Sequence, residues 1–256
     1  MTDNPLRKTP SGGPRLGMWI KIPALEIVEL TAHAGYDFVV IDLEHGPMTL
    51  ESCYQAIVVA QGRGLSALVR VPDPGGGLHQ RLLDMGADGL LIPHVTSPER
   101  ADALVRSMRF PPHGTRGLGT TSRAGVWGME PTADYLEHAR TKVLRVPQIE
   151  DIEAVDRAEA ICSVDGVNAV LVGAGDLSLA MGVSPGDPAM TAPVDRVLAA
   201  AHAHDIPCGT AVRTAEAAAQ AAHRGFDFVL AGNDATIFGT AARSLVQSTR
   251  DLIAAL

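Results

Sequence analysis

The stretch Gly35-Tyr-Asp-Phe-Val-Val-Ile-Asp42 decides the fold, because its design returns three more times along the chain. Each copy begins with glycine, has Asp or Asn two residues later, and then runs through apolar residues. The other copies are Gly86-Ala-Asp-Gly-Leu-Leu-Ile-Pro93, Gly166-Val-Asn-Ala-Val-Leu-Val-Gly173 and Gly225-Phe-Asp-Phe-Val-Leu-Ala-Gly232. The glycine is typical of the left-handed residue that ends a helix, and the apolar run is typical of a strand buried on both faces. The repeat therefore predicts units in which a helix leads into a buried strand.

Further apolar runs lie between these copies and bring the predicted strands to eight. We expect strands near residues 16–20, 37–42, 66–71, 88–93, 143–149, 168–173, 206–212 and 226–231. Stretches with helical spacing follow nearly all of them, up to a closing segment at 234–256. This alternation indicates a single-domain α/β protein, a (β/α)8 barrel over residues 16–256. A doubly wound open sheet is disfavoured, because no glycine fingerprint follows the first strand.

The composition describes an ordinary globular chain. Its 256 residues are 46% hydrophobic and 4% aromatic, with a net charge of −8, which argues against nucleic acid or an anionic membrane as the partner. The first residues lack an apolar signal-peptide core, and no apolar run approaches the roughly 18 residues of a membrane span. Three widely spaced cysteines without a C-x-x-C motif indicate free thiols in a reducing cytoplasm. We expect residues 1–15 to form a flexible lead-in.

Polar side chains gather where the predicted strands end, which is where the chemistry of this fold sits. Among them, Glu150 and Asp176 follow neighbouring strands. Both are candidate ligands for Mg²⁺ or Mn²⁺, since these cations take carboxylate oxygens and keep several waters. A structural interpretation competes, in which Asp176 caps one helix and Glu150 favours the dipole of another. Gly173 and Gly175 offer backbone N–H groups to a carboxylate or phosphate, although a glycine pair alone is weak support.

A histidine and an arginine complete this predicted mouth of the barrel. His45 lies near Asp42 and is a candidate general acid and base, with loop hydrogen bonding as the alternative. Arg70 ends a buried strand, where a charge needs either a substrate anion or a salt bridge to Asp42 or Glu44.

Two predicted loops and the lysine Lys21 bear on the choice of mechanism. The aperiodic segment 110–131 is long enough to be functional, as an active-site cover or a subunit contact. The run Pro74-Gly-Gly-Gly77 is a weaker phosphate candidate and predicts a flexible loop. A Schiff-base aldolase needs a lysine inside the barrel, and only Lys21 is placed for that; the others are Lys8 and Lys142. A metal-assisted route is therefore favoured over a Schiff base.

Six blocks of sequence, in order, carry a family resemblance. They are Asp42-x-Glu-His45-x-Pro47, Val69-Arg70-Val-Pro72, Leu83-Asp-Met-Gly-Ala-Asp-Gly-Leu-Leu-Ile-Pro93, Phe110-Pro-Pro-x-Gly-x-Arg-Gly117, Gln148-Ile-Glu150 and Gly173-x-x-Asp-Leu-Ser178. From about residue 17 to its end the chain resembles the HpcH/HpaI aldolase family, metal-dependent class II pyruvate aldolases related to the citrate lyase β subunit. The resemblance implies a (β/α)8 barrel whose last helix is exchanged between subunits of a homo-oligomer, a trimer or hexamer.

The resemblance also implies which residues carry the reaction. Glu150 and Asp176 would hold Mg²⁺, Mn²⁺ or Co²⁺, and Gln148 would orient a water or the substrate. Arg70 would face the keto oxygen and stabilise the enolate of pyruvate. His45, oriented by Asp42, would move a proton to or from the 4-hydroxyl group.

Other residues would shape the substrate pocket. The backbone at Gly173, Ala174 and Gly175 would receive the pyruvate carboxylate, and Trp19 would line the mouth. Asp84 would approach the active site of a neighbouring subunit. The chain departs from the family at Ala174, commonly proline, at Lys21, and at Ala211, where a bulkier apolar residue is expected. These departures touch the choice of aldehyde more than the core reaction.

The expected function is thus a cytoplasmic, metal-dependent lyase that cleaves a 4-hydroxy-2-oxo acid to pyruvate and an aldehyde, and runs the reverse addition. An oxaloacetate decarboxylase or a citrate-lyase-like acyl-CoA lyase would use the same scaffold. A non-catalytic binding barrel is the alternative from a different class. It would be favoured if Glu150, Asp176 and Arg70 paired with one another.

Overall fold

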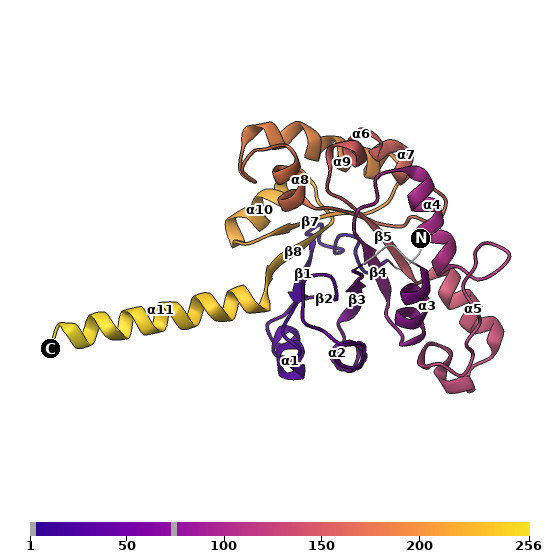
Figure 1. Ribbon diagram of the computed structural model, residues 1–256, viewed down its shortest axis with the longest axis horizontal. Coiled ribbons are helices and arrows are strands. Elements are labelled where there is room, and N and C mark those ends of the chain that lie inside the picture. Colours follow the sequence, from indigo (N-terminus) through magenta and orange to yellow (C-terminus); the bar gives the residue numbers. More distant parts are fainter. Residues whose placement is uncertain (1–3, 73–75) are drawn as a thin grey trace.

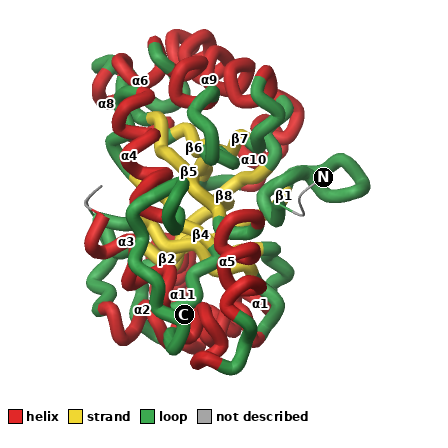
Figure 2. The backbone as a smooth tube through the Cα atoms, turned by 90° about the vertical axis from the view of Figure 1, so that its right-hand side faces the viewer, coloured by secondary structure: helices red, strands yellow, loops and turns green. Residues whose placement is uncertain are grey.

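The computed structural model describes residues 4–72 and 76–256 and confirms a closed barrel of parallel strands (Figures 1 and 2). Eight strands follow one another around the barrel in chain order, and β8 closes it by pairing with β1. The strands are β1 (Arg15–Ile20), β2 (Phe38–Asp42), β3 (Ser66–Arg70), β4 (Gly89–Ile92), β5 (Leu144–Ile149), β6 (Val170–Val172), β7 (Cys208–Val212) and β8 (Phe228–Asn233). The ends of each strand agree with the predicted ends to within two residues. Because the barrel is closed, the fold is not an open sheet.

Helices alternate with the strands, and all of them but the last surround the strands as an outer layer. They are α1 (Leu25–His33), α2 (Leu50–Gly62), α3 (Gly76–Asp84), α4 (Pro98–Met108), α5 (Thr132–Thr141), α6 (Ile152–Asp156), α7 (Ala158–Cys162), α8 (Ala174–Ala180), α9 (Thr191–Ala203), α10 (Ala215–Arg224) and α11 (Asp234–Ala254), with short 3-10 segments η1 (Arg123–Gly128) and η2 (Pro188–Met190). N-cap side chains stabilise the first turn of several helices. Thr49, Ser97 and Thr214 each accept a hydrogen bond from a backbone N–H three residues later.

The repeated stretches have a second role that links neighbouring strands. Their glycines all have positive φ, and three end a helix, whereas Gly166 lies in a turn four residues after α7. The Asp or Asn two residues later accepts a backbone N–H from the preceding strand. The four pairs are Asp37 with Leu16, Asp88 with Ala67, Asn168 with Arg145 and Asp227 with Cys208, at 2.8, 2.7, 2.7 and 3.0 Å. The repeat therefore ties each even-numbered strand to the start of the odd-numbered strand before it.

The barrel interior is filled mainly by aliphatic side chains and two phenylalanines. The rings of Phe38 and Phe228 meet edge to face with centroids 5.9 Å apart. Gly17 and Gly209 make room for them, because a Cβ at these positions would lie 2.2 and 2.1 Å from the respective ring. A second, larger apolar layer separates the strands from the helices. Both layers hold the strand ends in fixed positions.

The segment before β1 contacts the barrel. Leu6 is fully buried and belongs to the interior cluster, and the Asn4 side-chain amide donates to the Asn168 carbonyl at 2.8 Å. Residues 4–14, expected to be flexible, therefore pack against the barrel where its strands begin, and Leu6 inserts into the apolar interior.

The last helix, α11, extends away from the barrel (Figure 1). Its first residue, Asp234, is buried and accepts backbone N–H groups from Lys21 and Ile22 at 2.9 and 2.8 Å. Beyond this anchor the helix exposes large apolar side chains, among them Phe238, Leu245 and Leu252. This face of α11 is left without a covering element of its own chain.

Two further expectations concern the whole chain. Cys53, Cys162 and Cys208 are free and buried, as predicted. Over residues 4–72 and 76–256, no helix combines the length and apolar character needed to cross a membrane.

Candidate active site

A cavity of about 480 Å³ opens where the strands end. Most of the predicted site residues line it: Trp19, His45, Arg70, Gln148, Gly173, Ala174, Gly175, Asp176 and Ala211. Asp42 and Glu150 are buried and are hydrogen-bonded to two of these lining side chains, Arg70 and Gln148. The fold therefore brings together all the predicted site residues except Asp84.

Arg70 is held in place by its neighbours on three sides. Its Nε and Nη2 donate to Asp42 at 2.9 and 2.6 Å, and its Nη1 lies 3.1 Å from Glu44 Oε2. The guanidinium also lies over the Trp19 ring, 4.3 Å from the centroid. The salt bridges that the sequence allowed are thus both present, while Arg70 still lines the cavity. This network presents a cation of defined orientation to a substrate.

Asp42 is the centre of that network. Its side chain is fully buried and also accepts a hydrogen bond from Lys21 Nζ. Burial acts to raise the pKa of Asp42, but the hydrogen bond and charge of Arg70, and then Lys21, outweigh it and lower the pKa to about 2. Lys21, one of the three departures from the family, therefore lines the cavity and is ion-paired with Asp42.

The expected orientation of His45 by Asp42 is corrected by the structure. Asp42 Oδ1 accepts the backbone N–H of His45 at 3.1 Å, so it fixes the loop and not the ring. The reason is that Arg70 and Lys21 already engage this carboxylate. The imidazole is 60% exposed, and its Nε2 lies 3.6 Å from Glu44 Oε2. Glu44 is thus the carboxylate that faces the ring.

Glu150 is a buried carboxylate that contacts His94 and Gln148. It accepts the backbone N–H of His94 at 2.7 Å, and the His94 ring Nδ1 lies 3.1 Å away. The side-chain amide of Gln148 also donates to it. Burial raises the pKa of Glu150, His94 counteracts this, and the charge of Asp176 raises it further. The charge of Asp176 thus acts against the ionised form of Glu150.

The structure contradicts the capping interpretation for Asp176 only. Asp176 lies inside the first turn of α8, whose N-cap is Gly173, so it does not cap that helix. Glu150 precedes Asp151, which is the N-cap of α6. Asp176 is thus an acidic residue of the first turn and not the cap, and Glu150 lies one residue before the cap of α6, at the positive end of that helix.

The surroundings of the two acids fit a divalent cation. Gln148 Oε1 is buried without a hydrogen-bond partner, so an acceptor oxygen is left over beside Glu150. A Cβ at Gly173 would lie 2.6 Å from the Glu150 Cβ and 3.0 Å from Gln148 Nε2, so glycine is needed to admit these side chains. Within the described part of the chain, no three His, Cys, Asp or Glu side chains could hold a metal ion together. A two-carboxylate site completed by waters suits Mg²⁺ or Mn²⁺.

Sequence reasoning missed His94, which contacts both Glu150 and Glu44. It has a positive φ of 56° and follows β4 by two residues. The rule that polar residues at strand ends form the site would have found it, since β4 ends like the other strands. His94 supplies a backbone N–H and a ring nitrogen to Glu150.

Asp84 and the segment 110–131 lie away from this cavity. Asp84 ends α3 and binds Arg116 Nη2 at 2.7 Å. The segment 110–131 also bonds α3 through Gly117, and Arg123 donates to the carbonyl of Met85 just after this helix. None of its residues lines the cavity, so an active-site cover over the chain's own mouth is ruled out for the described residues. Residues 74 and 75 of the Pro74–Gly77 run lie outside the described residues, whereas Gly76 begins α3.

Comparisons with known proteins give a consistent result for the sequence and the fold. The model of the HpcH/HpaI aldolase/citrate lyase family matches residues 15–241. The chain is 33% identical to the hydroxypyruvate/pyruvate aldolase of Cupriavidus necator, covering 93% of this chain and 88% of that protein. It is 36% identical to the 4-hydroxy-2-oxovalerate aldolase of Novosphingobium aromaticivorans, covering 95% and 93%. A solved HpcH/HpaI family structure from Burkholderia cenocepacia J2315 superposes with a TM-score of 0.87 at 31% identity, covering 93% of this chain and 95% of that one.

Proposed function

Because the chain belongs to the HpcH/HpaI aldolase/citrate lyase family, we propose that it cleaves a 4-hydroxy-2-oxo acid reversibly into pyruvate and an aldehyde. The relatives named as pyruvate and hydroxyoxovalerate aldolases support this carbon–carbon lyase activity. One observation carries the proposal: Asp176 and the fixed cation of Arg70 line one cavity, and the buried Glu150 is hydrogen-bonded to Gln148, which lines the same cavity. Such a site suits an oxo acid that must become an enolate.

We propose that Glu150 and Asp176 hold a divalent cation, which is Mg²⁺, Mn²⁺ or Co²⁺. When bound there, the cation supplies positive charge that polarises the 2-oxo group. Gln148 contributes its free Oε1, which accepts a hydrogen bond from a water or a substrate hydroxyl beside this site. The backbone around Gly173 and Gly175 borders the same cavity and receives the carboxylate of the oxo acid.

Arg70 stabilises the charge that develops on the keto oxygen. Its guanidinium is oriented by Asp42, Glu44 and Trp19, so it needs no rearrangement when the charge forms. His45 accepts the proton of the 4-hydroxyl group during cleavage and returns it during addition. Its exposed ring lies at the cavity, with Glu44 as the nearest carboxylate. Trp19 and Ala211 bound the space for the aldehyde.

A non-catalytic barrel finds no support in the ion pairs. It would require Arg70 to neutralise Glu150 and Asp176, but Arg70 pairs with Asp42 and Glu44 instead. Arg70 is therefore not the group that neutralises the two acids.

We further propose a homo-oligomer in which α11 packs on a neighbouring copy and Asp84 approaches that copy's active site. The exposed apolar face of α11 and the distance of Asp84 from its own cavity support this arrangement. Free buried thiols support the cytoplasm as the compartment.

Metal removal tests the proposed reaction. Pyruvate release from 4-hydroxy-2-oxovalerate is measured after dialysis against a chelator, then after adding back Mg²⁺, Mn²⁺ or Co²⁺. We expect activity to fall at least about 100-fold and to return with the cation, because loss of a Lewis acid removes several kcal/mol of charge stabilisation. A Glu150→Gln variant should not be rescued by moderate metal concentrations. Full activity in the thoroughly demetallated protein would contradict the proposal.

A further inference from the structure

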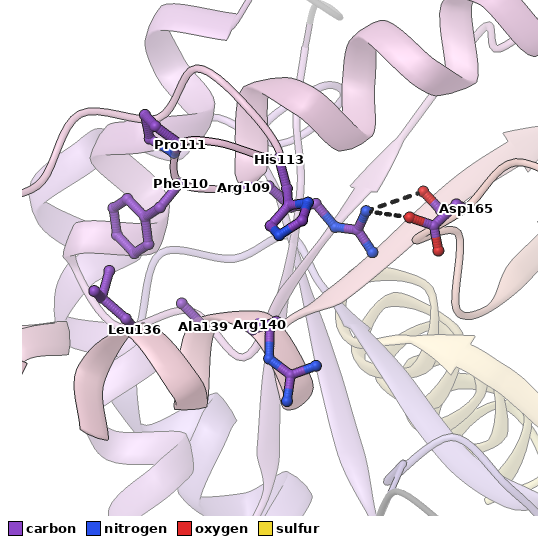
Figure 3. Close-up of a pocket in the computed structure, with 8 residues that line it drawn as sticks. All are labelled: Arg109, Phe110, Pro111, His113, Leu136, Ala139, Arg140 and Asp165. Carbon is purple, nitrogen blue, oxygen red and sulfur yellow. Dashed lines mark hydrogen bonds and ion pairs between the residues drawn. The ribbon is translucent and has the colours of Figure 1, made fainter. Parts of the chain in front are cut away.

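A second pocket lies at the opposite end of the barrel from the mouth. It has a volume of about 290 Å³ and is bounded by the end of α4, the turn that follows it, α5 and the residue Asp165. Figure 3 shows two unlike sides: Phe110, Pro111 and Leu136 lie on one, and His113, Arg109, Arg140 and Asp165 lie on the other. The pocket is thus apolar on one side and cationic on the other. Nothing in the proposed aldolase reaction uses it.

The cationic side has more positive groups than its single acidic lining residue can match. Arg109 Nη1 pairs with Asp165 at 2.7 Å (Figure 3). Among the described residues, Arg140 forms an ion pair with Glu137 alone, on its own helix. Both side chains are more than half exposed, so solvent screens that pair. His113 adds a ring nitrogen that can donate.

Buried nitrogen donors beneath this side lack acceptors. Arg109 Nε and Arg145 Nε are both buried without a hydrogen-bond partner. Arg145 is 1% exposed and donates Nη2 to the carbonyl of Ala139, a residue of the pocket wall, at 2.7 Å. Burial, and then the charges of Arg109 and Arg116, lower the pKa of Arg145 to about 10. No described carboxylate forms an ion pair with Arg145, so this region has an excess of positive charge.

The walls of the pocket are preformed. A Cβ at Gly166 would lie 2.5 Å from the Arg109 guanidinium, so glycine is required for Arg109 to lie there. The Phe110 ring is fixed by the Arg116 guanidinium, 4.6 Å from its centroid, and by an edge contact with Tyr135. A ligand would therefore meet an ordered ring and an ordered cation.

We propose that this pocket binds a small organic anion, in which a phosphate or carboxylate group is carried on a compact apolar body. The oxyanion lies between Arg109, His113 and Arg140, where it completes the charge balance and accepts hydrogen bonds. The apolar body lies against Phe110 and Leu136. Charge and shape together favour such a ligand over inorganic phosphate, which cannot use the apolar side.

Phenyl phosphate is the probe, and the methyl signals of Leu136 in methyl-labelled protein are the readout. Phenyl phosphate should shift these signals saturably, also with pyruvate present in excess, and inorganic phosphate should bind more weakly. Arg140→Ala should weaken binding about tenfold, because a charged hydrogen bond is lost. The matched control Arg106→Ala removes an exposed arginine of α4 outside the pocket and should bind like the wild type.

Three results would overturn the proposal: unshifted Leu136 methyls at saturating probe, equal affinity in Arg140→Ala and the wild type, or displacement of the probe by pyruvate. Equal affinity for inorganic phosphate would overturn the apolar half of the site. The readout needs no catalysis, so it stands or falls separately from the aldolase activity.

Discussion

Asp42 is a fully buried carboxylate with five donors around it. They are Arg70 Nε and Nη2, Lys21 Nζ, and the backbone N–H groups of Glu44 and His45. These donors stabilise the ionised form more than burial destabilises it, which is why the pKa falls from its ordinary 3.8 to about 2. The sequence suggested a catalytic role for Asp42. Its contacts show that it positions Arg70, Lys21 and the loop that carries His45.

The depressed pKa of Asp42 predicts acid sensitivity. A carboxylate whose folded pKa is lowered stabilises the protein above its unfolded pKa, and this contribution is lost as the pH falls from about 4 to about 2. The shift corresponds to about 2 kcal/mol. Asp42→Asn should lower the free energy of unfolding at neutral pH and flatten its slope over this interval, as measured by urea unfolding. Asp205→Asn, at an 89% exposed side chain, is the control and should keep the wild-type slope. An unchanged slope in Asp42→Asn would refute the assignment.

His45 offers a clean test of proton transfer, because its ring is 60% exposed and its removal costs little packing. In His45→Ala we expect aldol cleavage to slow by about 100-fold or more, the usual effect of losing a general base. Exchange of the methyl protons of pyruvate with solvent should slow much less, since it does not involve the 4-hydroxyl group. Both rates are measured by NMR, with His223→Ala, an exposed histidine of α10, as control. Equal losses in both reactions would remove His45 from this role.

At the scale of the elements, the repeated Gly-x-Asp/Asn pattern couples the strands. Its polar side chain ends the turn after a helix and binds a backbone N–H of the neighbouring strand. The presence of Asn at 168 and Asp at 37, 88 and 227 indicates that an acceptor oxygen is what matters and not the charge. Burial of Asp88 is consistent with this interpretation, because it raises the pKa of Asp88 and so disfavours the ionised form.

This acceptor role predicts different outcomes for two substitutions of Asp88. Asp88→Ala leaves the Ala67 N–H and the Gln61 side-chain amide without their partner and should cost about 1–3 kcal/mol of folding free energy. Asp88→Asn keeps an acceptor and should cost clearly less. Thermal and urea unfolding of the two variants measure the difference. If both variants lose the same stability, the charge and not the hydrogen bond is what the strand pair requires.

At the scale of the whole molecule, α11 is the element that the barrel does not explain. Its exposed apolar residues Phe238, Leu245 and Leu252 recur every seven residues and so lie on one face of the helix. A helix that exposes such a face while extending from the molecule (Figure 1) suits packing on a second copy.

The proposed assembly can be broken on that face. Phe238→Glu combined with Leu245→Glu should shift the protein from an oligomer to a monomer in light scattering after gel filtration, because charges replace the apolar contact. Activity should fall with it if Asp84 completes a neighbour's site. Thr240→Glu, on the opposite face of α11, is the control and should leave the assembly intact. A monomeric wild type, or an oligomer that survives the double substitution, would contradict the arrangement.

The sequence by itself determined the barrel and the group of residues at its mouth. Glycine positions, apolar runs and helical spacing are local signals, and the closed order of β1 to β8 follows once they alternate. Since parallel strands end on one face, the residues at and just after the strand ends had to meet there, as Arg70, Gln148 and Asp176 do.

Only the tertiary structure decided which of these residues pair. Asp42 pairs with Arg70 and Lys21, which come from the ends of β3 and β1. The His45 ring lies beside Glu44 instead, and the His94 ring lies beside Glu150. The sequence order does not encode such choices, because each side chain has several partners within reach of its strand end. Distances of a few ångströms, set by strand register and burial, select one of them. The same holds for α11, whose apolar face is visible in the sequence while its separation from the barrel is visible only in the fold.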